Sequence, residues 1–396
     1  MTPEFKKKLW VILAAALSLR LLYVFAMPPR PMTWDDSAQW NKTALRFLDG
    51  AGFLTQTEDL DPKRPPVYPL FMAAVYSAAG RENFTAVKIA QALIASVTCL
   101  IWVLAARFLF GEWLAFRLGL LLALYPPLIV YSEVLQSETV FIFLFALFFW
   151  QWLRGNRTLG WKPFAACGLL LGLMNLCKGS TFLFPFWMAA AFLIPGERAK
   201  WRQYALMAAL SFLVISPWMW RNHKVYGGWI PAAAGGPEQF WSGTLPWAEQ
   251  RLFGNSNLFH QFDPVVNVLE RERAFRDAAV ANIQADPAAY ARLTLRKFVF
   301  FWLQPVGQNL AERKGFIFGA AFYLWQGFLV FFFLKGLITT RSRWKELIPF
   351  YLMITYLTCL HVAMAPEPRY RLPLEPILML FMFAGLYAHR AEPARG

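Results

Sequence analysis

The sequence opens on FKKKLWVILAAALSLRLLYVFAMPPRPMTWDD, residues 5–36. Three lysines precede an apolar run of roughly 19 residues, which is long enough to cross a bilayer as a helix. Pro28 and Pro29 follow without a small-residue cleavage site, so we expect a retained span rather than a cleaved signal peptide. Because basic residues mark the cytoplasmic side, Lys6 to Lys8 place the start of this span inside the cell. Trp34-Asp35-Asp36 then lies just beyond its outer end.

The composition extends this interpretation to the whole chain. Hydrophobic residues make up 58% of the 396 residues, charged residues only 16%, and the mean hydropathy is +0.38. Soluble domains have about 45–50% hydrophobic residues and about 25% charged residues. These values exclude disordered, collagen-like and disulfide-scaffold chains and indicate a polytopic membrane protein. The four cysteines lie in apolar runs without a CxxC pair, so neither a disulfide framework nor a zinc site is expected.

The positive charge follows the predicted loops. The chain has 39 basic and 24 acidic residues, a formal net charge of +15. Every short loop that the topology puts inside carries Arg or Lys, which indicates membrane orientation and contact with anionic lipid rather than nucleic acid. The fold class is therefore an all-α polytopic bundle of about ten transmembrane helices, with both termini inside. Its predicted spans are residues 5–27, 85–109, 114–131, 137–153, 163–178, 180–195, 203–219, 316–337, 346–363 and 372–388.

Two long segments, 28–84 and 221–315, fall outside the membrane in this topology. They divide the chain into a core at 1–220 that includes the first outer loop, an outer-face segment at 221–315, and C-terminal transmembrane helices at 316–396. Residues 264–285 and 290–302 have helical spacing and are separated by Asp286-Pro287. The second of these amphipathic helices is expected to lie along the outer membrane face.

Charged residues from chain-distant places meet at the outer face. Charges at membrane depth are costly, so their placement indicates a site. A carboxylate near lipid can accept a proton, whereas Arg grips a phosphate through paired hydrogen bonds and Lys through a point charge. A base beside a phosphate clamp fits transfer from a lipid-linked phosphate to a hydroxyl or amine. The set comprises Asp35, Asp36, Lys63, Arg64, Glu133, Glu138, Lys178, Arg221, Glu367, Arg369, Tyr370 and Arg371.

Simpler interpretations exist for most of this set. Asp35 and Asp36 fit solvated loop acids, and Glu133 and Glu138 fit helix caps. Lys63 and Arg64 could pair with nearby loop acids, whereas Arg369 and Arg371 lie outside against the positive-inside rule. Two further groups are not expected in the site. Arg20 should snorkel or pair inside the bundle, and His223 and His260 are lone loop histidines without a metal-ligand pattern.

Taken in order, several segments resemble the GT-C superfamily of polytopic glycosyltransferases. The likeness is to the branch of protein O-mannosyltransferases and the lipid A aminoarabinose transferase, and it covers roughly residues 5–390. WDDSAQW at 34–40 occupies the place of that family's first-loop acidic motif. The other segments that carry the resemblance are RPPVYPLF at 64–71, PPLIVYSEVLQSETVF at 126–141, GLLLGLMNLCKGSTFLFP at 168–185, ISPWMWRNHKVYGG at 215–228, ADPAAYARLTLRKFVFFW at 285–302 and RYRLPLEPILML at 369–380.

This resemblance implies a function and a set of roles. The donor is a polyprenyl-phosphate sugar, and the acceptor is a glycolipid, lipopolysaccharide, polysaccharide or protein at the outer face. Asp35 is the general base that activates the acceptor for inverting attack, and Asp36 and Glu138 assist it. The donor phosphate is held by Lys63, Arg64, Lys178, Arg221, Arg369, Tyr370 and Arg371.

The resemblance also implies a cellular setting. Some relatives use a divalent metal ion and others do not, and no ligand cluster in this sequence demands one. The chain is short for the superfamily, so acceptor specificity is expected to come from the two outer segments. A bacterial inner membrane is the expected location, since the exposed sequons at 41–43 and 83–85 would attract glycan in a eukaryotic lumen.

Two other functions fit part of the pattern. A transporter or flippase of lipid-linked sugars would also carry charges in a helical bundle, but transporters commonly have internal repeats and midplane sites, and neither is apparent here. An O-antigen-ligase-like transferase would depend on outer-loop Arg and His rather than on a first-loop acidic pair.

Overall fold

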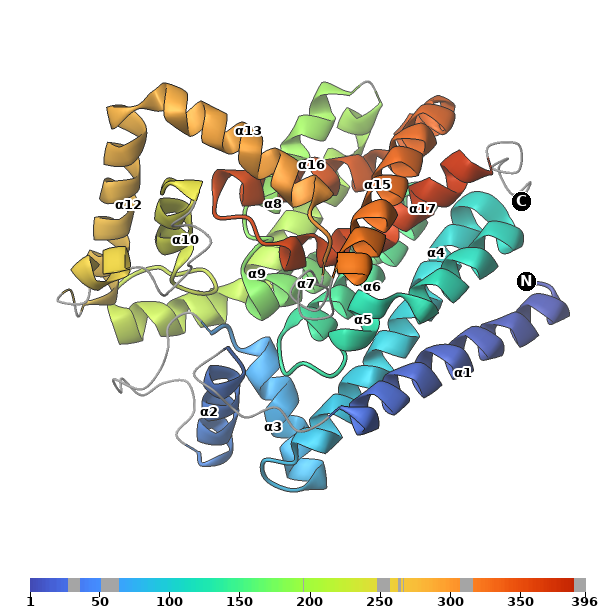
Figure 1. Cartoon of the computed structure of the whole chain (residues 1–396), viewed down its shortest axis with the longest axis horizontal. Helices are drawn as coiled ribbons and strands as arrows, with labels where there is room; N and C mark the ends of the chain where they lie inside the picture. Colours follow the sequence, from blue (N-terminus) through green and yellow to red (C-terminus); the bar gives the residue numbers. More distant parts are fainter. Residues whose placement is uncertain are drawn as a thin grey trace.

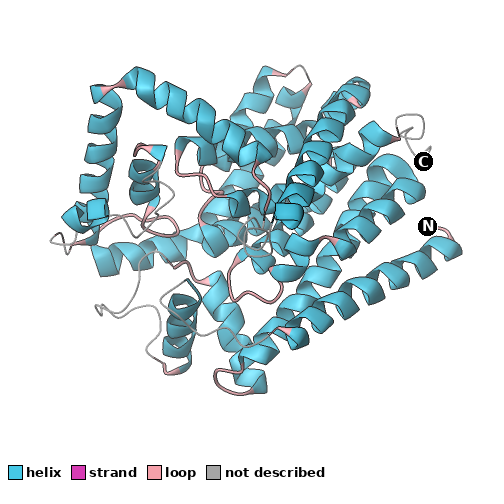
Figure 2. Cartoon of the chain, viewed as in Figure 1, coloured by secondary structure: helices cyan, strands magenta, loops and turns pink. Residues whose placement is uncertain are grey.

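The computed structural model describes residues 1–27, 36–50, 64–194, 196–247, 257–262, 265, 267–306 and 316–387. Every regular element in these ranges is helical and none is a strand (Figure 2). The predicted all-helical fold class is confirmed. Figure 1 shows the long helices packed together, with the shorter helices of the two predicted outer segments gathered at the left of the view.

The main bundle consists of α1 (Pro3–Ala26), α4 (Phe84–Leu124), α6 (Glu138–Thr158), α7 (Trp161–Lys178), α9 (Trp201–Tyr226), α15 (Phe316–Thr339), α16 (Ile348–Ala363) and α17 (Glu375–Leu386). Helix α1 packs along α4, α7 packs between α6 and α9, and α15 packs on α17 (Figure 1). Large aromatic side chains fill the contacts: Trp102 lies against Phe149, and Phe149 stacks on Phe350 with ring centroids 4.8 Å apart.

The short elements of the bundle are α5 (Pro126–Val130), α8 (Phe184–Trp187) and the 3-10 helices η1 (Met188–Leu193), η2 (Glu197–Lys200), η4 (Arg341–Leu347) and η5 (Pro368–Leu374). The segments predicted to lie outside supply α2 (Asp36–Leu48), α3 (Val67–Ala79), α10 (Gly236–Ser242), η3 (Asn257–Phe262), α12 (Val268–Ala285) and α13 (Pro287–Leu303). The break predicted at Asp286-Pro287 is present, and the Asp286 carboxylate accepts a hydrogen bond from the Ala289 N–H as the α13 cap.

Helix α4 contains two of the predicted spans. Gly111, at φ 83° and ψ 176°, interrupts it between them, a conformation that glycine adopts without a steric penalty. The helix ends at Leu124, and Pro126 and Pro127 then start α5 because a prolyl ring has no N–H for the helix interior. The second half of α4 is therefore shorter than the predicted span at 114–131.

Five segments in the described ranges are long and apolar enough to cross a membrane: Pro3–Ala26, Phe84–Leu124, Glu197–Tyr226, Gly319–Thr339 and Arg341–Ala363. The other predicted spans coincide with helices that are shorter or less apolar. Residues 180–195 do not form the single long helix predicted for them. Gly179 ends α7 in a left-handed conformation, α8 begins only at Phe184, and the chain continues as η1.

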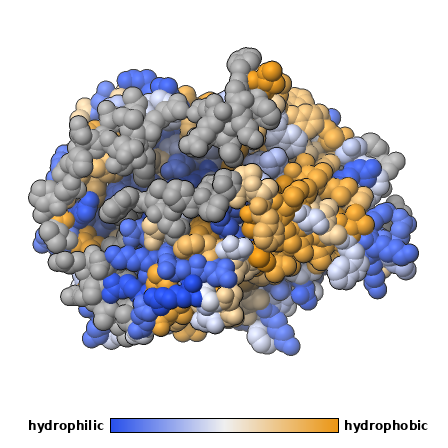
Figure 3. Space-filling view, turned by 60° about the horizontal axis from the view of Figure 1, so that its bottom comes forward, coloured by the Kyte–Doolittle hydropathy of each residue, from blue (hydrophilic) through white to orange (hydrophobic). Residues whose placement is uncertain are grey.

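The surface of the bundle suits lipid. Figure 3 shows a broad hydrophobic area beside hydrophilic surface. Large exposed apolar side chains occur on four of the membrane-length helices: Trp10, Leu22 and Phe25 on α1, Leu93 and Leu124 on α4, Phe212 and Leu213 on α9, and Leu324 and Phe331 on α15. Exposed apolar side chains in such numbers are typical of helices that face a bilayer.

Arg20 pairs inside the bundle, one of the two placements predicted for it. Its side chain is completely buried in α1 and donates hydrogen bonds to the carbonyl oxygens of Ala16, Leu122 and Ala123 at 3.0–3.3 Å. Leu122 and Ala123 belong to the last turn of α4, whose carbonyls have no intrahelical donors. The guanidinium therefore caps α4 where the helix dipole favours a cation.

Candidate functional site

A cavity of about 370 Å³ lies where the bundle meets the shorter helices. Its lining comes from α2, residues 64–65, the start of α6, residues 177–183, residues 233–239, α16 and η5. We call it the charged cavity. One part of its wall is apolar and consists of Phe182, Leu183, Tyr356 and Leu360.

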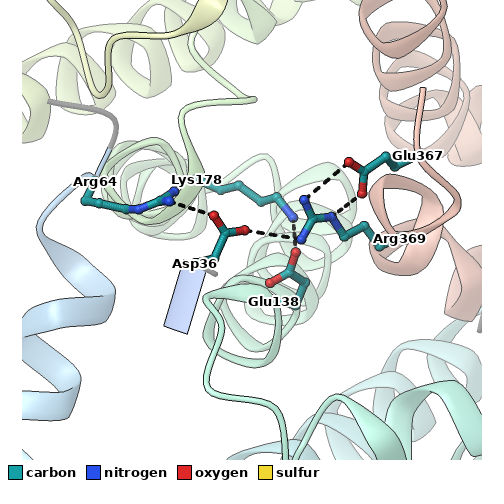
Figure 4. Close-up of polar contacts among 6 residues, drawn as sticks. All are labelled: Asp36, Arg64, Glu138, Lys178, Glu367 and Arg369. Atoms are coloured by element: carbon teal, nitrogen blue, oxygen red, sulfur yellow. Dashed lines mark hydrogen bonds and ion pairs between the residues drawn. The ribbon is translucent and has the colours of Figure 1, made fainter. Parts of the chain in front are cut away.

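Asp36 begins α2 and lies between two guanidinium groups (Figure 4). Its Oδ1 accepts a hydrogen bond from Arg64 at 2.6 Å, and its Oδ2 accepts one from Arg369 at 3.3 Å. Arg64 also lies over the Trp40 ring, 4.9 Å from its centroid. Burial opposes ionisation of Asp36, but the charges of Arg64 and Arg369 outweigh it and hold the pKa of this carboxyl below its usual value.

Glu138 and Lys178 form the second ion pair. Glu138 is the first residue of α6, where the helix dipole favours an acid, and Lys178 is the last residue of α7, where it favours a cation. The Lys178 Nζ donates to the Glu138 Oε1 at 2.6 Å, and Nζ also lies 5.3 Å from the centroid of the Tyr370 ring. Because each group sits at a helix terminus, α6 and α7 fix this pair from two directions.

Glu367 and Arg369 complete the cluster from the loop before η5 and from η5 itself (Figure 4). The Arg369 Nε lies 2.5 Å from the Glu367 Oε2, and its Nη2 donates to the Glu367 Oε1 at 3.4 Å. The next residue, Tyr370, stacks on His361 of α16 with ring centroids 4.7 Å apart. We call Asp36, Arg64, Glu138, Lys178, Glu367 and Arg369 the charged cluster. It contains three carboxylates and three cations, so its formal charge balances.

Residues 233–239 form another part of the wall, which presents only small side chains between Ala233 and Gly236. The Trp218 indole donates to the Ala232 carbonyl at 2.6 Å, and the Gly235 N–H donates to the Glu272 carboxylate at 2.9 Å. These bonds hold the wall against α9 and α12.

Lys297 of α13 fixes the adjoining part of that wall. It is fully buried, and its Nζ donates to the carbonyls of Gly243, Ala363 and Met364 at 2.9, 3.2 and 3.2 Å. Burial lowers the pKa of Lys297 to about 8.

Six of the ten predicted site residues line the charged cavity: Asp36, Arg64, Glu138, Lys178, Arg369 and Tyr370. Asp35 and Lys63 lie outside the described residues. Glu133, from the wider outer-face set, is buried away from the lining and pairs with Lys88 at 2.6 Å. Arg221 also does not line the cavity; it is buried between the Trp218 and Tyr226 rings and donates to Asn222 at 2.9 Å.

Arg371 departs most clearly from its predicted role. It is completely buried and does not line the charged cavity. Its guanidinium bonds to Glu375 at 2.8 Å and to the carbonyls of Phe301 and Gln304 at the end of α13. The Tyr125 hydroxyl donates to the other Glu375 oxygen at 3.1 Å. We call Arg371, Glu375 and Tyr125 the buried latch. With its donors used inside the protein, Arg371 is not available to a phosphate.

The prediction did not assign site roles to Glu367, Trp40 and His361. Trp40 could have been found, because it lies four residues after Asp36 and so shares a helix face with it. Glu367 belonged to the predicted outer-face set, and its position two residues before Arg369 was a usable signal for a role beside that arginine. His361 lies in an apolar helix where nothing in the sequence distinguishes it from a core residue.

The donor set does not suit a divalent metal ion. Asp36 and Glu138 each bond to cations, and within the described ranges no group of three His, Cys, Asp or Glu side chains could hold a metal ion. His223 stacks on Trp229 at 4.4 Å, and the side chain of His260 lies outside the described part.

Comparison with known proteins gives this geometry a context. Residues 63–220 match the dolichyl-phosphate-mannose-protein mannosyltransferase family. The oligosaccharyltransferase of Archaeoglobus fulgidus, tethered with an acceptor peptide, aligns over 98% of this chain with a TM-score of 0.58 at 13% identity. The chain has the GT-C fold. This fold agrees with the one that the sequence resemblance implied, and the segment matched to the mannosyltransferase family contributes Arg64, Glu138 and Lys178 to the charged cavity.

Other similarities are weaker or partial. The chain covers 49% of that oligosaccharyltransferase, so it spans about half of its length. ArnT from Cupriavidus metallidurans in the apo state aligns with a TM-score of 0.45 at 16% identity, covering 97% of this chain and 77% of ArnT. The same ArnT bound to undecaprenyl phosphate gives a TM-score of 0.42. No curated protein matches the chain in sequence.

Proposed function

We propose that the protein is a membrane glycosyltransferase that moves a sugar from a polyprenyl-phosphate donor to an acceptor. The observation that carries the proposal is the convergence of Arg64, Lys178 and Arg369 on one cavity beside Asp36. Arginine and lysine suit a phosphate, and the apolar wall at Phe182, Leu183, Tyr356 and Leu360 suits the first part of a lipid chain. The match to a family named for a dolichyl-phosphate-linked donor agrees with this chemistry.

The reaction follows from these roles. The acceptor oxygen attacks the anomeric carbon, the bond from that carbon to the phosphate oxygen breaks, and the polyprenyl phosphate leaves with the bonding electrons. Cations at Arg64, Lys178 and Arg369 stabilise the charge that develops on the leaving phosphate. Attack opposite the leaving group inverts the anomeric centre.

A general base must take the acceptor proton, and Asp35 remains the predicted one. Asp36 is a poor candidate because both of its oxygens bond to guanidinium groups, which lower its pKa. Asp36 instead orients Arg64 and Arg369, and Glu138 orients Lys178. Tyr370 supports the same region through its contact with Lys178.

Undecaprenyl phosphate, the expected leaving lipid, gives the direct test of this proposal. The purified full-length protein in detergent should bind it saturably, and Arg369→Ala should abolish binding without changing the melting temperature. The acceptor is a glycolipid, lipopolysaccharide, polysaccharide or protein. Mass spectrometry of lipids and polysaccharide from a deletion strain should reveal a missing sugar. Absence of binding and of any change in envelope glycans would refute the proposal.

We also propose that the charged cavity lies at the outer face of a bacterial inner membrane. The basic inner loops support this orientation. Cysteine labelling checks this orientation in a Cys359→Ser background, since Cys359 is the exposed one of the four cysteines. Gln284→Cys on α12 should react with an impermeant reagent in intact cells. Thr158→Cys, at the end of α6, should react only after the membrane is opened. The reverse pattern would invert the topology.

A further inference from the structure

The charged cluster has no spare cation for a phosphate. Arg64 and Lys178 contact carboxylates at 2.6 Å, and Arg369 contacts both Asp36 and Glu367. A donor phosphate, which is a diester with one negative charge, therefore competes with at least one carboxylate when it enters this balanced cluster, and the dianionic polyprenyl phosphate left after transfer competes more strongly. The question is which of the three carboxylates leaves its cation most easily.

Two of the three carboxylates are firmly held. Glu138 has a side chain only 5% exposed and is fixed at the start of α6. Asp36 is 32% exposed and its contact with Arg369 is long, at 3.3 Å, but it is the first residue of α2 and its contact with Arg64 at 2.6 Å holds it in the site. Neither carboxylate can move into water without leaving a helix terminus or a short ion pair.

Glu367 differs from Glu138 in exposure and from both carboxylates in its place in the fold. Its side chain is 32% exposed, as is that of Asp36, but it lies before η5 rather than in a helix, and Arg369 is the cation that it contacts. Pro366 and Pro368 flank it and restrict the backbone, and its carbonyl accepts a hydrogen bond from the Tyr370 N–H at 3.0 Å. Rotation of the side chain alone can therefore move the carboxylate into water while the backbone and Arg369 stay in place.

We propose that Glu367 is an exchangeable counterion, which occupies Arg369 while the donor site is empty and gives way to the donor phosphate. This inference rests on the proposed function, because it assumes a phosphate ligand at Arg369. Glu367 keeps the guanidinium paired between turnovers and competes with the phosphate for it. After transfer, the same competition helps the polyprenyl phosphate to leave.

The sign of the effect on affinity separates this role from a purely orienting one. If Glu367 competes with phosphate, its removal tightens phosphate binding. If Glu367 only orients Arg369, its removal weakens binding because the guanidinium loses its support. An ion pair of this exposure contributes at most roughly 1 kcal/mol, so we expect undecaprenyl phosphate to bind Glu367→Gln about fivefold more tightly.

The experiment measures undecaprenyl phosphate binding to the full chain in detergent, for wild type, Glu367→Gln, Glu367→Ala and Glu367→Asp. Both neutral variants should bind more tightly, and the Asp variant, which keeps the charge, should stay near wild type. Asp49→Asn, which breaks the half-exposed pair with Arg81 away from the charged cavity, should have no effect. Melting temperatures of all variants should match wild type.

Kinetics give a second readout. Product inhibition by undecaprenyl phosphate should strengthen in Glu367→Gln, and kcat should fall together with the donor KM. Equal or weaker binding by both neutral variants, with wild-type binding intact, would overturn the counterion role. Failure of the wild-type protein to bind undecaprenyl phosphate would instead overturn the proposed function.

Discussion

Arg369 and Arg371 lie two residues apart in η5 and belong to different regions of the molecule. Arg369 lines the charged cavity, where its partners are carboxylates about one-third exposed. Arg371 belongs to the buried latch, where it and Glu375 are completely buried. The same type of side chain therefore lines a cavity in one region and is wholly buried in the other. The difference lies in the partners: partly exposed carboxylates for Arg369, and backbone carbonyls with a fully buried carboxylate for Arg371.

The largest effect should come from loss of the predicted general base, Asp35. Asp35→Asn keeps the shape of the predicted base and removes its basicity, so transfer should fall by roughly 10²–10⁴-fold. Donor binding and melting temperature should stay near wild type, and Asp277→Asn on exposed α12 should stay active. The assay measures turnover of a polyprenyl-phosphate sugar. If Asp35→Asn keeps more than about a tenth of wild-type turnover while Glu138→Gln is inactive, the base is assigned to the wrong carboxylate.

A substitution in the buried latch should lower the stability of the protein. Arg371→Ala leaves Glu375 buried without its cation, and breaking a buried pair costs roughly 3–5 kcal/mol. Thermal unfolding in detergent should show a large drop, or little folded protein should be recovered. Arg276→Ala, which breaks an exposed pair with Asp277, should change stability by no more than about 0.5 kcal/mol. A stable Arg371→Ala variant that has lost undecaprenyl phosphate binding would return Arg371 to the phosphate site.

Replacement by lysine should sharpen the contrast. Arg369→Lys keeps the charge but loses the paired hydrogen bonds to a phosphate, so donor affinity should fall about tenfold, the equivalent of one charge-assisted bond of roughly 1.5 kcal/mol. Its melting temperature should not change. Arg371→Lys should show the opposite pattern, a lower melting temperature with donor affinity retained in the folded fraction. Equal responses of the two variants would erase the distinction between the regions.

The smallest effect concerns pH. The pKa of Asp36 is lowered in the folded protein, so its ion pairs contribute stability above the ordinary aspartate value near 3.9 and lose it as the pH falls through the lower, folded value. Between pH 5 and 8 Asp36 should stay ionised. Asp36→Asn should therefore lower the rate without moving either limb of the pH–rate profile. A shifted acidic limb would mean that Asp36, rather than Asp35, accepts the proton.

Much of the fold was predictable because bilayer thickness and basic loops constrain helix position strongly. Helices α12 and α13 and the break between them also followed from spacing and from Asp286-Pro287. The convergence of Asp36, Arg64, Glu138, Lys178, Arg369 and Tyr370 was predictable because a cost in free energy keeps charges at the membrane boundary. The sequence therefore predicted how deep in the membrane each charged residue lies.

The direction in which each charged side chain points was not predictable in this way. Arg369 and Arg371 have the same depth, but η5 is a 3-10 helix with about three residues per turn, so residues two apart face different ways. Which of them faces the cavity depends on the end of α13, where backbone carbonyls accept hydrogen bonds from the Arg371 guanidinium. Arg221 shows the same limit, since its placement between two aromatic rings is a matter of packing.

The buried latch also bears on how the protein is made. Its members are separated by some 250 residues of chain, since Tyr125 precedes α5 and Glu375 begins α17. A ribosome synthesises the chain from the N-terminus, so Tyr125 and α13 are already in place when Arg371 and Glu375 emerge. The latch closes only after α17 enters the bundle, and η5 then holds Arg369 beside Asp36. The charged cluster therefore forms only once α17 has been synthesised and inserted.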